Sequence, residues 1–359
     1  MEAVTVPSIG MLGGGFMART HTHAARAAGA HLDALASSTP ESSRAAGRAL
    51  GYGRALGAED LIAASLPVVH VCTPNDSHAK YSAAAIRAGS FVICEKPLAT
   101  NVQDAEDLVT LARDSNMVGA VPFVYRYHPM AREARARFHS GSAGRLTTVL
   151  GLYLQDWMLN QGQMNWRVDT AHGGPSRAFA DIGSHLVDLI EFVTGDTITR
   201  LVAAIRTIHP QRGSQSVHTE DAVALTVEFA GGAIGSLLIS QVAPGRKNGL
   251  VFEVAGTEAS LRFDQEDPEL LWVGRPEGSL TLHRGGEQLS EEGSRLSFLP
   301  PGHPQGYQDA FNAFIADAYS AAAGSLPEGM PTFADGLRAT RITRAVLESA
   351  RTGTWVDVR

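Results

Sequence analysis

The chain has 359 residues, too many for one ordinary hydrophobic core, so we expect two domains. A hydrophobic fraction of 44% and a charged fraction of 19% are typical of a globular protein, and a net charge of −7 argues against a nucleic-acid-binding surface. The apolar start is interrupted by Gly13, Gly14 and Gly15 and lacks a basic leader, so we expect no signal peptide. No segment approaches the roughly 18 apolar residues of a membrane span, so we expect no membrane partner. Cys72 and Cys94 lie in apolar runs, which favours reduced thiols and a cytoplasmic location.

A glycine-rich turn follows the first expected strand, residues 4–10, and leads into a helix. Gly13, Gly15 and Ala18 fit the dinucleotide fingerprint GxGxxA. The first glycine permits the tight turn, the second admits a pyrophosphate, and the alanine lets helix and strand pack closely, while the helix N-terminus favours phosphate charge. The candidate cofactor residues at this turn are Gly13, Gly15, Phe16 and Met17.

The second strand, expected over residues 32–36, does not end in the acidic residue that usually binds the ribose of NAD. Ser37, Ser38 and Thr39 stand there instead, and their hydroxyls could bind a 2′-hydroxyl or a 2′-phosphate. Arg44 on the next helix could add charge for NADP, although a surface role is equally compatible with its position. The sequence therefore leaves the choice between NAD and NADP open.

Two more apolar strands, over residues 68–72 and 91–94, each run into a polar turn. Parallel sheets bind ligands at the carboxyl ends of their strands. Pro97 biases Lys96 toward an extended backbone, so the lysine is presented from a bend and is a candidate catalytic group. The earlier turn is either a simple helix cap or a cofactor contact. The cofactor candidates at these two turns are Thr73, Pro74, Asn75, His78, Glu95 and Lys96.

Strands and helices alternate up to a last expected strand over residues 118–124, which predicts an α/β domain with a doubly wound parallel sheet, a Rossmann domain. Beyond it, strand-like stretches joined by hairpin-like turns predict an α+β domain with a mostly antiparallel open sheet. We therefore expect a dinucleotide-binding domain over 1–122 and a substrate-binding and oligomerisation domain over 123–359. We expect a loop over 276–304, helices over 180–193, 308–323 and 333–351, and a closing strand over 355–358.

Residues 157–174 form an irregular stretch rich in Trp, Asn, Gln and Arg, and a loop of this length inside a compact protein is usually functional. Flat aromatic faces and polar groups that bind hydroxyls suit a sugar ring, although each of these residues could equally serve packing between domains. The candidate substrate contacts are Tyr125, Arg126, Trp157, Asn165, Trp166 and Arg167.

Asp181, His185 and Asp188 are spaced by four and three residues, which places them on one face of the helix expected over 180–193. They could be a polar group that satisfies itself, a metal site, or an acid/base pair. Because neither HExxH nor a cysteine cluster accompanies them, we expect no metal. Histidine titrates near neutral pH and a carboxylate one turn away can orient it, which favours acid/base chemistry.

These motifs together resemble the Gfo/Idh/MocA family of NAD(P)-dependent sugar and polyol oxidoreductases, over nearly the whole chain. The matches are GxGxxA at 13–18, TPNxxH at 73–78, CEKP at 94–97, Tyr125-Arg126, Gly144 and DIGSHxxD at 181–188. The resemblance implies that Lys96 lies beside the nicotinamide and the substrate hydroxyl, with Asp181 and His185 across the substrate as the rest of the catalytic set. LQDWM at 154–158 and NWRVD at 165–169 look most like the subgroup acting on sugars and glycosides, including levoglucosan-type dehydrogenases.

The resulting hypothesis is an enzyme that transfers a hydride between a secondary hydroxyl of a sugar, glycoside or polyol and NAD or NADP. His185 is our first choice for the base, with Lys96 stabilising the developing alkoxide, and the alternative makes Lys96 the proton acceptor. One rival is a nicotinamide-dependent glycosidase that oxidises, eliminates and reduces, and another is a non-catalytic dinucleotide-binding sensor. The open sheet and the resemblance imply a homodimer or homotetramer.

Overall fold

The computed structural model describes residues 7–359, so residues 4–6 of the expected first strand lie outside the described residues. The chain forms two compact units. The first holds the residues up to Val124 together with Gln308–Thr340, and the second holds Tyr125–Tyr307 together with Arg341–Arg359. The expected boundary after residue 122 lies close to the first crossing, but the sequence did not indicate that residues 308–340 return to the first unit.

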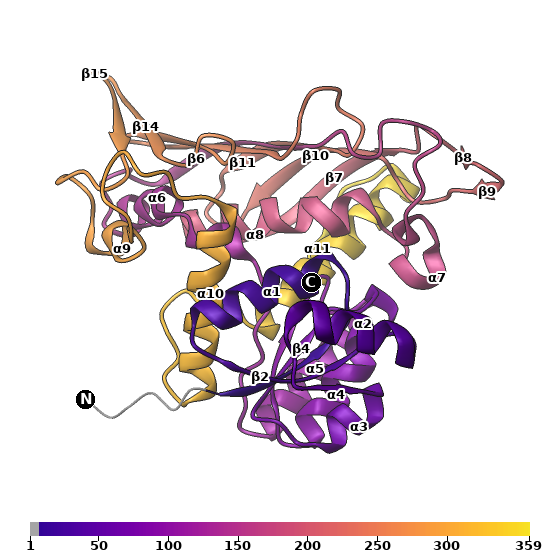
Figure 1. The fold of residues 1–359 in the computed structure, drawn as a ribbon. Helices are drawn as coiled ribbons and strands as arrows, with labels where there is room; N and C mark the ends of the chain where they lie inside the picture. Colours follow the sequence, from indigo (N-terminus) through magenta and orange to yellow (C-terminus); the bar gives the residue numbers. More distant parts are fainter. Residues whose placement is uncertain (1–6) are drawn as a thin grey trace. The chain divides into compact units, whose positions relative to one another are not determined.

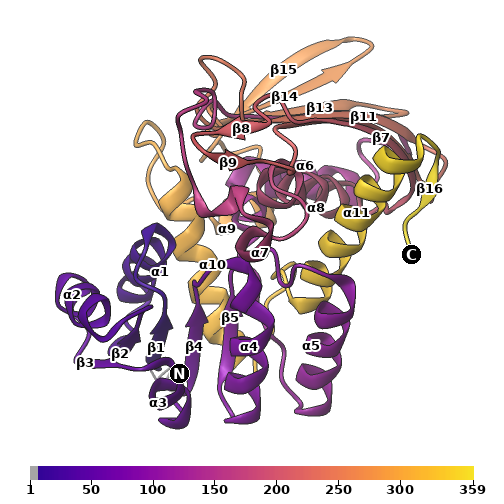
Figure 2. The ribbon, with the colours of Figure 1, turned by 90° about the vertical axis from the view of Figure 1, so that its right-hand side faces the viewer.

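The first unit contains a five-stranded parallel sheet in the order β3-β2-β1-β4-β5, which confirms the expected doubly wound fold (Figure 1, with all five strands labelled in Figure 2). Every residue of β4 and β5 is buried, as a continuous apolar run predicts. The strands are β1 (Ser8–Leu12), β2 (His31–Ala36), β3 (Arg54–Leu56), β4 (Val68–Val71) and β5 (Phe91–Cys94). The helices are α1 (Phe16–Ala27), α2 (Pro40–Leu50), α3 (Ala58–Ala63), α4 (His78–Arg87), α5 (Val102–Asp114) and most of α10 (Tyr307–Ala322).

The strand expected over residues 118–124 does not form. Ala120 alone bridges to Ile93 on one side and to Thr332 on the other, and the chain then enters the short helix η2 (Val124–Tyr127). The physical reason is Pro122, which cannot donate to a sheet ladder and so ends the pairing after a single bridge.

The second unit contains a nine-stranded sheet in the order β15-β14-β13-β12-β6-β11-β10-β7-β16. Its pairs are antiparallel except for β6 with β11, which confirms a mostly antiparallel sheet. The strands are β6 (Leu146–Leu154), β7 (Ile198–Arg206), β10 (Ala222–Phe229), β11 (Ile234–Ser240), β12 (Gly249–Gly256), β13 (Ser260–Asp264), β14 (Leu270–Arg275), β15 (Gly278–His283) and β16 (Val356–Asp357). A separate small hairpin pairs β8 (Gln211–Arg212) with β9 (Gln215–Ser216).

The stretch expected as loop over residues 276–304 contains two regular elements, so that prediction was wrong in part. β15 pairs with β14 across the two-residue turn 276–277, after which Gly278 takes a φ of +148°, and α9 (Glu291–Arg295) follows directly after Ser290. The Ser290 hydroxyl accepts from the Gly293 backbone N–H at 3.1 Å and so caps this short helix. The composition of this stretch, rich in Gly, Pro and charged residues, did not indicate the hairpin, which is stabilised by the hydrogen bonds between β14 and β15.

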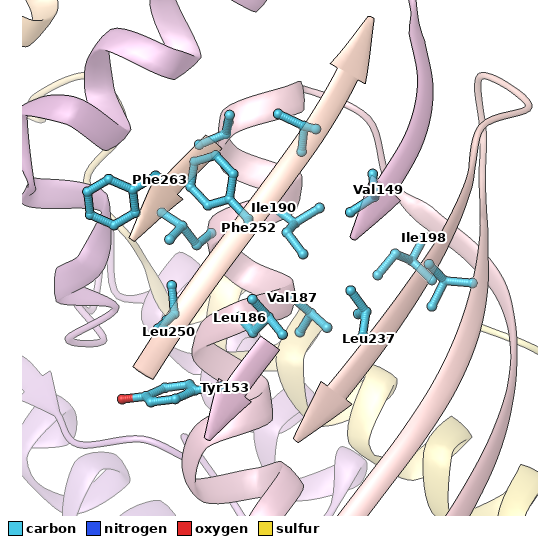
Figure 3. Packing of buried hydrophobic residues seen from close by; sticks show 14 of the residues in the cluster. Val149, Tyr153, Leu186, Val187, Ile190, Ile198, Leu237, Leu250, Phe252 and Phe263 are labelled. Atoms are coloured by element: carbon cyan, nitrogen blue, oxygen red, sulfur yellow. The ribbon is translucent and has the colours of Figure 1, made fainter. Parts of the chain in front are cut away.

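One face of the nine-stranded sheet is covered by α6 (Pro129–His139), α8 (Ser184–Thr194) and the C-terminal part of α11 (Phe333–Thr352), as Figures 1 and 2 show. Leu186 and Ile190 of α8 lie among strand residues such as Leu237 and Phe252 in a core where all four are at most 2% exposed (Figure 3). Alternate strand residues point to the other face, where Leu150, Ile234 and Leu238 are exposed. Within residues 7–359, none of the helices has the length and apolar character that crossing a bilayer needs.

Candidate functional site

The turn between β1 and α1 has the backbone that a dinucleotide phosphate needs. Gly13 has a φ of +115°, and a Cβ there would collide with the carbonyl oxygen of Cys72. Gly15 precedes α1 and faces open space, and no side chain of the described residues caps the N–H groups of that helix. Phe16 is exposed and Met17 half-buried. Backbone donors at an uncapped helix start fit a pyrophosphate, so the residues present fit the cofactor.

The hydroxyl-bearing segment after β2 is largely engaged in starting α2. The Ser43 hydroxyl accepts from the Ser37 N–H at 2.8 Å, and the Thr39 hydroxyl accepts from the Ser42 N–H at 3.1 Å. The exposed Arg44 donates to Glu41 at 2.7 Å. Ser38 is exposed beside them. The Glu41 carboxylate therefore offsets the one positive charge that the sequence offered for a 2′-phosphate.

His78 joins the two polar turns of the first unit. Its ring nitrogens lie 2.9 Å from the Thr73 carbonyl oxygen and 2.7 Å from the Pro97 carbonyl oxygen. Burial lowers the pKa of His78, against the opposing effect of these two carbonyls. Pro74 and the buried Asn75 lead into the short helix η1 (Asn75–Ser77), at the start of α4. The His78 side chain therefore links the turn after β4 to the bend that follows Lys96.

Glu95 anchors the backbone of the half-buried Lys96 and begins a buried hydrogen-bonded chain. Its Oε2 accepts from the Lys96 backbone N–H at 3.1 Å, and its Oε1 lies 3.1 Å from Nε2 of His21. His21 Nδ1 lies 2.8 Å from His70 Nδ1, and His70 Nε2 lies 3.0 Å from the Tyr319 hydroxyl. We call these four side chains, Glu95, His21, His70 and Tyr319, the histidine chain; each is at most 5% exposed.

The ionisation of the histidine chain follows from burial and from its partners. Burial acts to raise the pKa of Glu95, but the His21 hydrogen bond and neighbouring positive charge leave that pKa below its ordinary value. Burial, and then His21, hold the pKa of His70 well below its usual range, so His70 is neutral and shares one hydrogen with His21. The sequence did not predict this histidine chain, and the one signal it offered was a histidine inside the apolar run of β4.

In the second unit, the helix expected over 180–193 begins as a π-helical turn, η4 (Phe179–Gly183), and continues as α8. Such wide turns are frequent at functional sites. The expected polar stripe divides here: Asp188 forms a buried ion pair with Arg126, whose Nε lies 2.8 Å from Oδ2 of Asp188. The Arg126 guanidinium also lies 4.8 Å from the ring centre of Phe192. Arg126 is therefore engaged in binding α8, while its role in binding substrate stays a prediction.

Asp181 lies with three of the predicted loop residues. Its Oδ2 accepts from Nε2 of Gln241 at 2.8 Å, and its Oδ1 lies 3.5 Å from Nε of Arg167. The Arg167 guanidinium lies 4.4 Å from the ring centre of Trp166, and the Asn165 side chain accepts from the Arg167 N–H at 3.1 Å. The structure thus presents a carboxylate, a guanidinium and an aromatic face together.

His185 lies against a closed ring of hydrogen bonds. Its imidazole is 5.1 Å from the Tyr125 ring in an edge-on arrangement. Asn248 Nδ2 donates to the Tyr125 hydroxyl at 3.1 Å, the two tyrosine hydroxyls lie 2.6 Å apart, and the Tyr153 hydroxyl donates to Asn248 Oδ1 at 2.8 Å. Each hydroxyl can therefore donate once and accept once. Burial raises the pKa of both tyrosines, and the Asp181 charge adds to this, so both stay protonated.

Trp157 is tied to the same ring through Gln155. The Trp157 indole N–H donates to Gln155 Oε1 at 2.8 Å, and Gln155 Nε2 donates to Asn248 Oδ1 at 2.8 Å. Four residues of this site were not predicted from the sequence: Tyr153, Gln155, Asn248 and Gln241. Their only signal was position, because each stands near the end of a strand or just before one, without a motif. Within residues 7–359, no three His, Cys, Asp or Glu side chains gather as a metal site.

Comparison with known proteins places both units in one family. Residues 8–123 match the model of an oxidoreductase family with an NAD-binding Rossmann fold, and residues 131–262 match the GFO/IDH/MocA C-terminal domain. Levoglucosan dehydrogenase of Pseudarthrobacter phenanthrenivorans is 30% identical over 98% of each chain.

Solved structures agree over nearly the full length. An oxidoreductase domain protein from Kribbella flavida has a TM-score of 0.91 at 34% identity, covering 99% of this chain and 100% of that one. Levoglucosan dehydrogenase in complex with NADH and levoglucosan has a TM-score of 0.92 at 30% identity, with the same coverage. An inositol dehydrogenase homologue from Azotobacter vinelandii, complexed with NADH and myo-inositol, has a TM-score of 0.89 at 28% identity over 98% of each chain.

The fold and the dinucleotide turn define a nicotinamide-dependent oxidoreductase. The chain belongs to the Gfo/Idh/MocA family, as its motifs indicated, and it is an NAD(P)-dependent dehydrogenase.

Proposed function

We propose that this enzyme oxidises a secondary hydroxyl of a sugar, anhydrosugar, glycoside or related polyol, reversibly, with NAD or NADP as hydride acceptor. The observation that carries the proposal is the second unit's grouping of an edge-on His185, the Asp181 carboxylate and flanking aromatic faces. Aromatic faces suit a sugar ring, and protonated hydroxyls and amides suit its hydroxyl groups. The named sugar and polyol complexes of the solved relatives support the same substrate class.

We propose Lys96, Asp181 and His185 as the catalytic residues. Oxidation moves a hydride from the carbinol carbon to the cofactor, whose nicotinamide supplies that chemistry when bound, and releases the hydroxyl proton. His185 takes that proton, and the positive charge of Lys96 stabilises the oxygen as negative charge develops on it. Asp181 holds a substrate hydroxyl or the protonated base. Trp157, Asn165, Trp166 and Arg167, with Tyr125 and Arg126, remain our candidates for substrate contacts.

We propose that the first unit binds the dinucleotide, the second binds the substrate, and NAD is the preferred cofactor. Arg44 is paired with Glu41, so the segment after β2 offers a 2′-phosphate little net positive charge. The Glu41→Gln variant removes the offsetting carboxylate, and we expect kcat/KM with NADP to rise about two- to threefold while that with NAD is unchanged. Equal preference for the two cofactors in the wild type would contradict the NAD assignment.

The experiment is the appearance of reduced nicotinamide absorbance with NAD⁺ and with NADP⁺, across sugars, anhydrosugars, inositols and glycosides. The matched control is Lys96→Ala, which should keep cofactor affinity within about tenfold yet lose most turnover. Lysine-dependent reduction on any member establishes the reaction and its substrate class. Release of an aglycone without net reduction would instead assign the oxidation, elimination and reduction cycle of a glycosidase.

We also propose a homo-oligomer that covers the helix-free face of the nine-stranded sheet. Leu150, Ile234 and Leu238 are 53%, 55% and 41% exposed on adjacent strands β6 and β11. Such an apolar patch on a sheet is typical of a subunit interface. Leu150→Lys together with Leu238→Lys should convert the assembly to a smaller species in sedimentation, and a wild-type monomer at micromolar concentration would contradict the proposal.

The two free thiols are compatible with a cytoplasmic location.

A further inference from the structure

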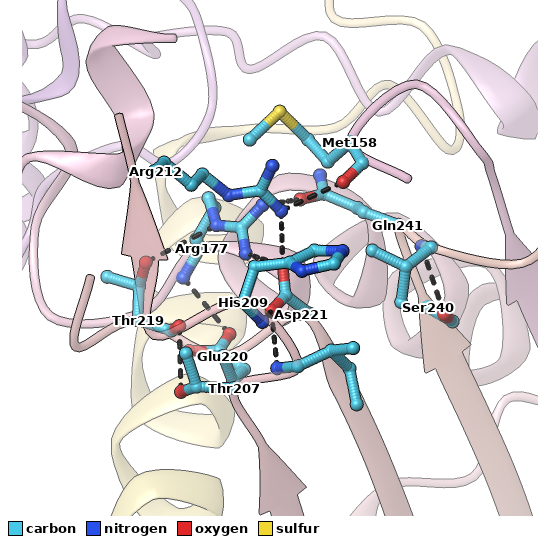
Figure 4. Close-up of polar contacts among 12 residues, drawn as sticks. Met158, Arg177, Thr207, His209, Arg212, Thr219, Glu220, Asp221, Ser240 and Gln241 are labelled. Carbon is cyan, nitrogen blue, oxygen red and sulfur yellow. Dashed lines mark hydrogen bonds and ion pairs between the residues drawn. The ribbon is translucent and has the colours of Figure 1, made fainter. Parts of the chain in front are cut away.

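Gln241 is held so that it can only donate to the Asp181 carboxylate. Its Oε1 accepts from Nη1 of Arg177 at 3.1 Å, and its Nε2 lies 2.8 Å from Oδ2 of Asp181 (Figure 4 shows the Arg177 side). A guanidinium has donors only, so the amide oxygen must face Arg177 and the amide N–H must face Asp181. Gln241 and Arg177 are at most 1% exposed. The Gln241 amide therefore holds the Asp181 carboxylate in place as a hydrogen-bond acceptor.

Arg177 belongs to a cluster of buried charges around one carboxylate. Asp221 accepts from Nη2 of Arg177 and, at 3.0 Å, from Nη2 of Arg212 (Figure 4). All three side chains have 0% exposure, and both arginines hold the pKa of Asp221 below its ordinary value despite burial. We call Arg177, Asp221 and Arg212 the arginine cluster. Because charges buried without partners are costly, the positions of the three are interdependent.

Arg212 carries the constraint into the loop of candidate substrate contacts. Its guanidinium donates to the carbonyl oxygens of Met158 and Asn160, each at 2.8 Å. The Met158 backbone N–H in turn donates to the Gln241 carbonyl oxygen at 3.1 Å. The apolar support of this loop is small, a cluster of Met158, Val168 and Val217. The arginine cluster therefore supplies much of what fixes residues 156–169.

The neighbouring Glu220 fixes the other end of the same assembly. Its Oε1 accepts from the backbone N–H groups of Arg177 and Phe179 at 3.0 and 2.9 Å, and from the Ser176 hydroxyl at 2.7 Å. These groups lie just before and at the first residue of the π-helical turn that carries Asp181. Glu220 and Asp221 are consecutive residues just before β10. Glu220 thus holds the backbone at the start of the helix that carries Asp181, and Asp221 holds the loop 156–169 through Arg212.

We propose that Gln241 is the positioning residue for Asp181, and that the arginine cluster sets this carboxylate and the loop 156–169 as one unit. The role of Asp181 in this proposal rests on the proposed function. The Gln241 amide keeps Asp181 an acceptor for a substrate hydroxyl or a protonated base. The loop 156–169 and the Asp181 carboxylate are then held by the same buried side chains, so a sugar that displaces the loop also displaces Asp181. Selectivity among sugars follows from that coupling.

The first test is Gln241→Glu, which keeps the shape and the contact with Arg177 but brings a second carboxylate to 2.8 Å from Asp181. The two carboxylates must then share a proton, which raises the pKa of the pair. We expect kcat/KM for the sugar at neutral pH to fall about 10- to 100-fold, with the acid limb of the pH profile moved upward. Gln241→Met removes the donor without adding charge, so it should lower kcat and leave that limb in place.

Gln265→Glu is the matched control, because it places a carboxylate at a buried glutamine outside the network. An acid limb in Gln241→Glu that coincides with that of Gln265→Glu and the wild type would overturn the positioning role. So would unchanged kcat in Gln241→Met.

The coupling is tested with Arg212→Lys, since a lysine cannot hold two loop carbonyls and Asp221 together. We expect KM for the sugar to rise about tenfold with a smaller change in kcat, and faster amide hydrogen exchange both in 156–169 and in 176–185. Arg284→Lys is the control: this buried arginine pairs with Glu269 at 2.7 Å and holds a different loop through the Leu299 carbonyl. It should lower thermal stability comparably without altering KM or exchange in these segments.

Hydrogen exchange separates the coupling from the proposed function. If Asp181→Asn keeps full turnover, the catalytic assignment of Asp181 fails, and the exchange data still decide whether loop and helix move together. Loosening of 156–169 alone in Arg212→Lys, or no more loosening than in Arg284→Lys, would overturn the coupling.

Discussion

The histidine chain of the first unit and the arginine cluster of the second unit are both buried, and they differ in the charged groups that they contain. The histidine chain links the Glu95 carboxylate through His21 to the neutral His70 and the Tyr319 hydroxyl. The arginine cluster of the second unit places two guanidinium groups on the single carboxylate of Asp221. Imidazole and hydroxyl groups in a hydrogen-bonded chain can each donate or accept, whereas two buried guanidinium groups on one carboxylate need every partner in place.

The difference matches what each network supports. Through Glu95, the histidine chain binds one backbone N–H of Lys96. This lysine comes shortly after β5, a strand in which every residue is buried. The arginine cluster must hold an irregular loop with a small apolar core. Where packing fixes the backbone, a chain of imidazole and hydroxyl groups suffices, and where packing is thin, ionic hydrogen bonds between guanidinium and carboxylate groups take over its role.

The largest effect should come from breaking the charged network. Asp221→Ala leaves Arg177 and Arg212 buried and without their shared carboxylate, so we expect the free energy of unfolding to fall by about 3–5 kcal/mol. Urea denaturation measures this. The control is Asp33→Ala, whose partner Arg54 is half exposed, with an expected loss of at most ~1 kcal/mol. Similar losses in the two variants would mean that the arginine cluster is not an interdependent unit.

A buried histidine of the second unit tests how neutral groups respond to acid. Burial lowers the pKa of His128 from 6.5 to about 4. A lowered histidine pKa means that its stabilisation is fully present above pH 6.5 and is lost as the pH falls toward 4. That loss is worth ~3 kcal/mol of unfolding free energy, and His128→Phe should remove it while keeping the packing on Tyr125. An unchanged slope of unfolding free energy against pH in the variant would contradict this.

Interrupting the histidine chain should cost less than breaking the arginine cluster. His70→Phe fills the space but leaves His21 and Tyr319 without the partner between them, so we expect a loss of about 1–3 kcal/mol. Because the pKa of His70 is lowered, part of the wild-type loss of stability below pH 6.5 should also disappear. Chemical denaturation at neutral and acidic pH checks both, and a loss as large as that of Asp221→Ala would erase the distinction between the networks.

The smallest effect should come from the end of the histidine chain. Tyr319→Phe removes one hydroxyl that lies 3.0 Å from His70, and we expect a loss of ~1 kcal/mol or less. Combined with His70→Phe, its effect should nearly vanish, because the hydrogen bond is already absent. Additive losses in the double variant would show that Tyr319 does not act through the chain.

Several local features of this protein follow directly from its amino-acid sequence. The Gly13 turn, the buried strands β4 and β5 and the alternation along the antiparallel strands all follow from backbone sterics and from periodicity among near neighbours. The family motifs indicated a dinucleotide-binding oxidoreductase for the same reason, since each motif is a short run whose chemistry depends on its own turn. Even local prediction failed at Pro122. The apolar neighbours of this residue favoured a strand, but Pro122 has no backbone N–H and ended the pairing.

The pairing of the buried polar groups, by contrast, depends on the folded arrangement of distant segments. Gln241 reaches Asp181 across 60 positions, and Tyr319 reaches His70 across 249, through the return of residues 308–340 to the first unit. The physical reason is that a buried polar side chain is stabilised by whichever complementary group the folded chain brings within hydrogen-bond distance. Hydrophobic patterns specify which face of an element is buried, and the fold then selects the partners of Asp181, His185 and Glu95.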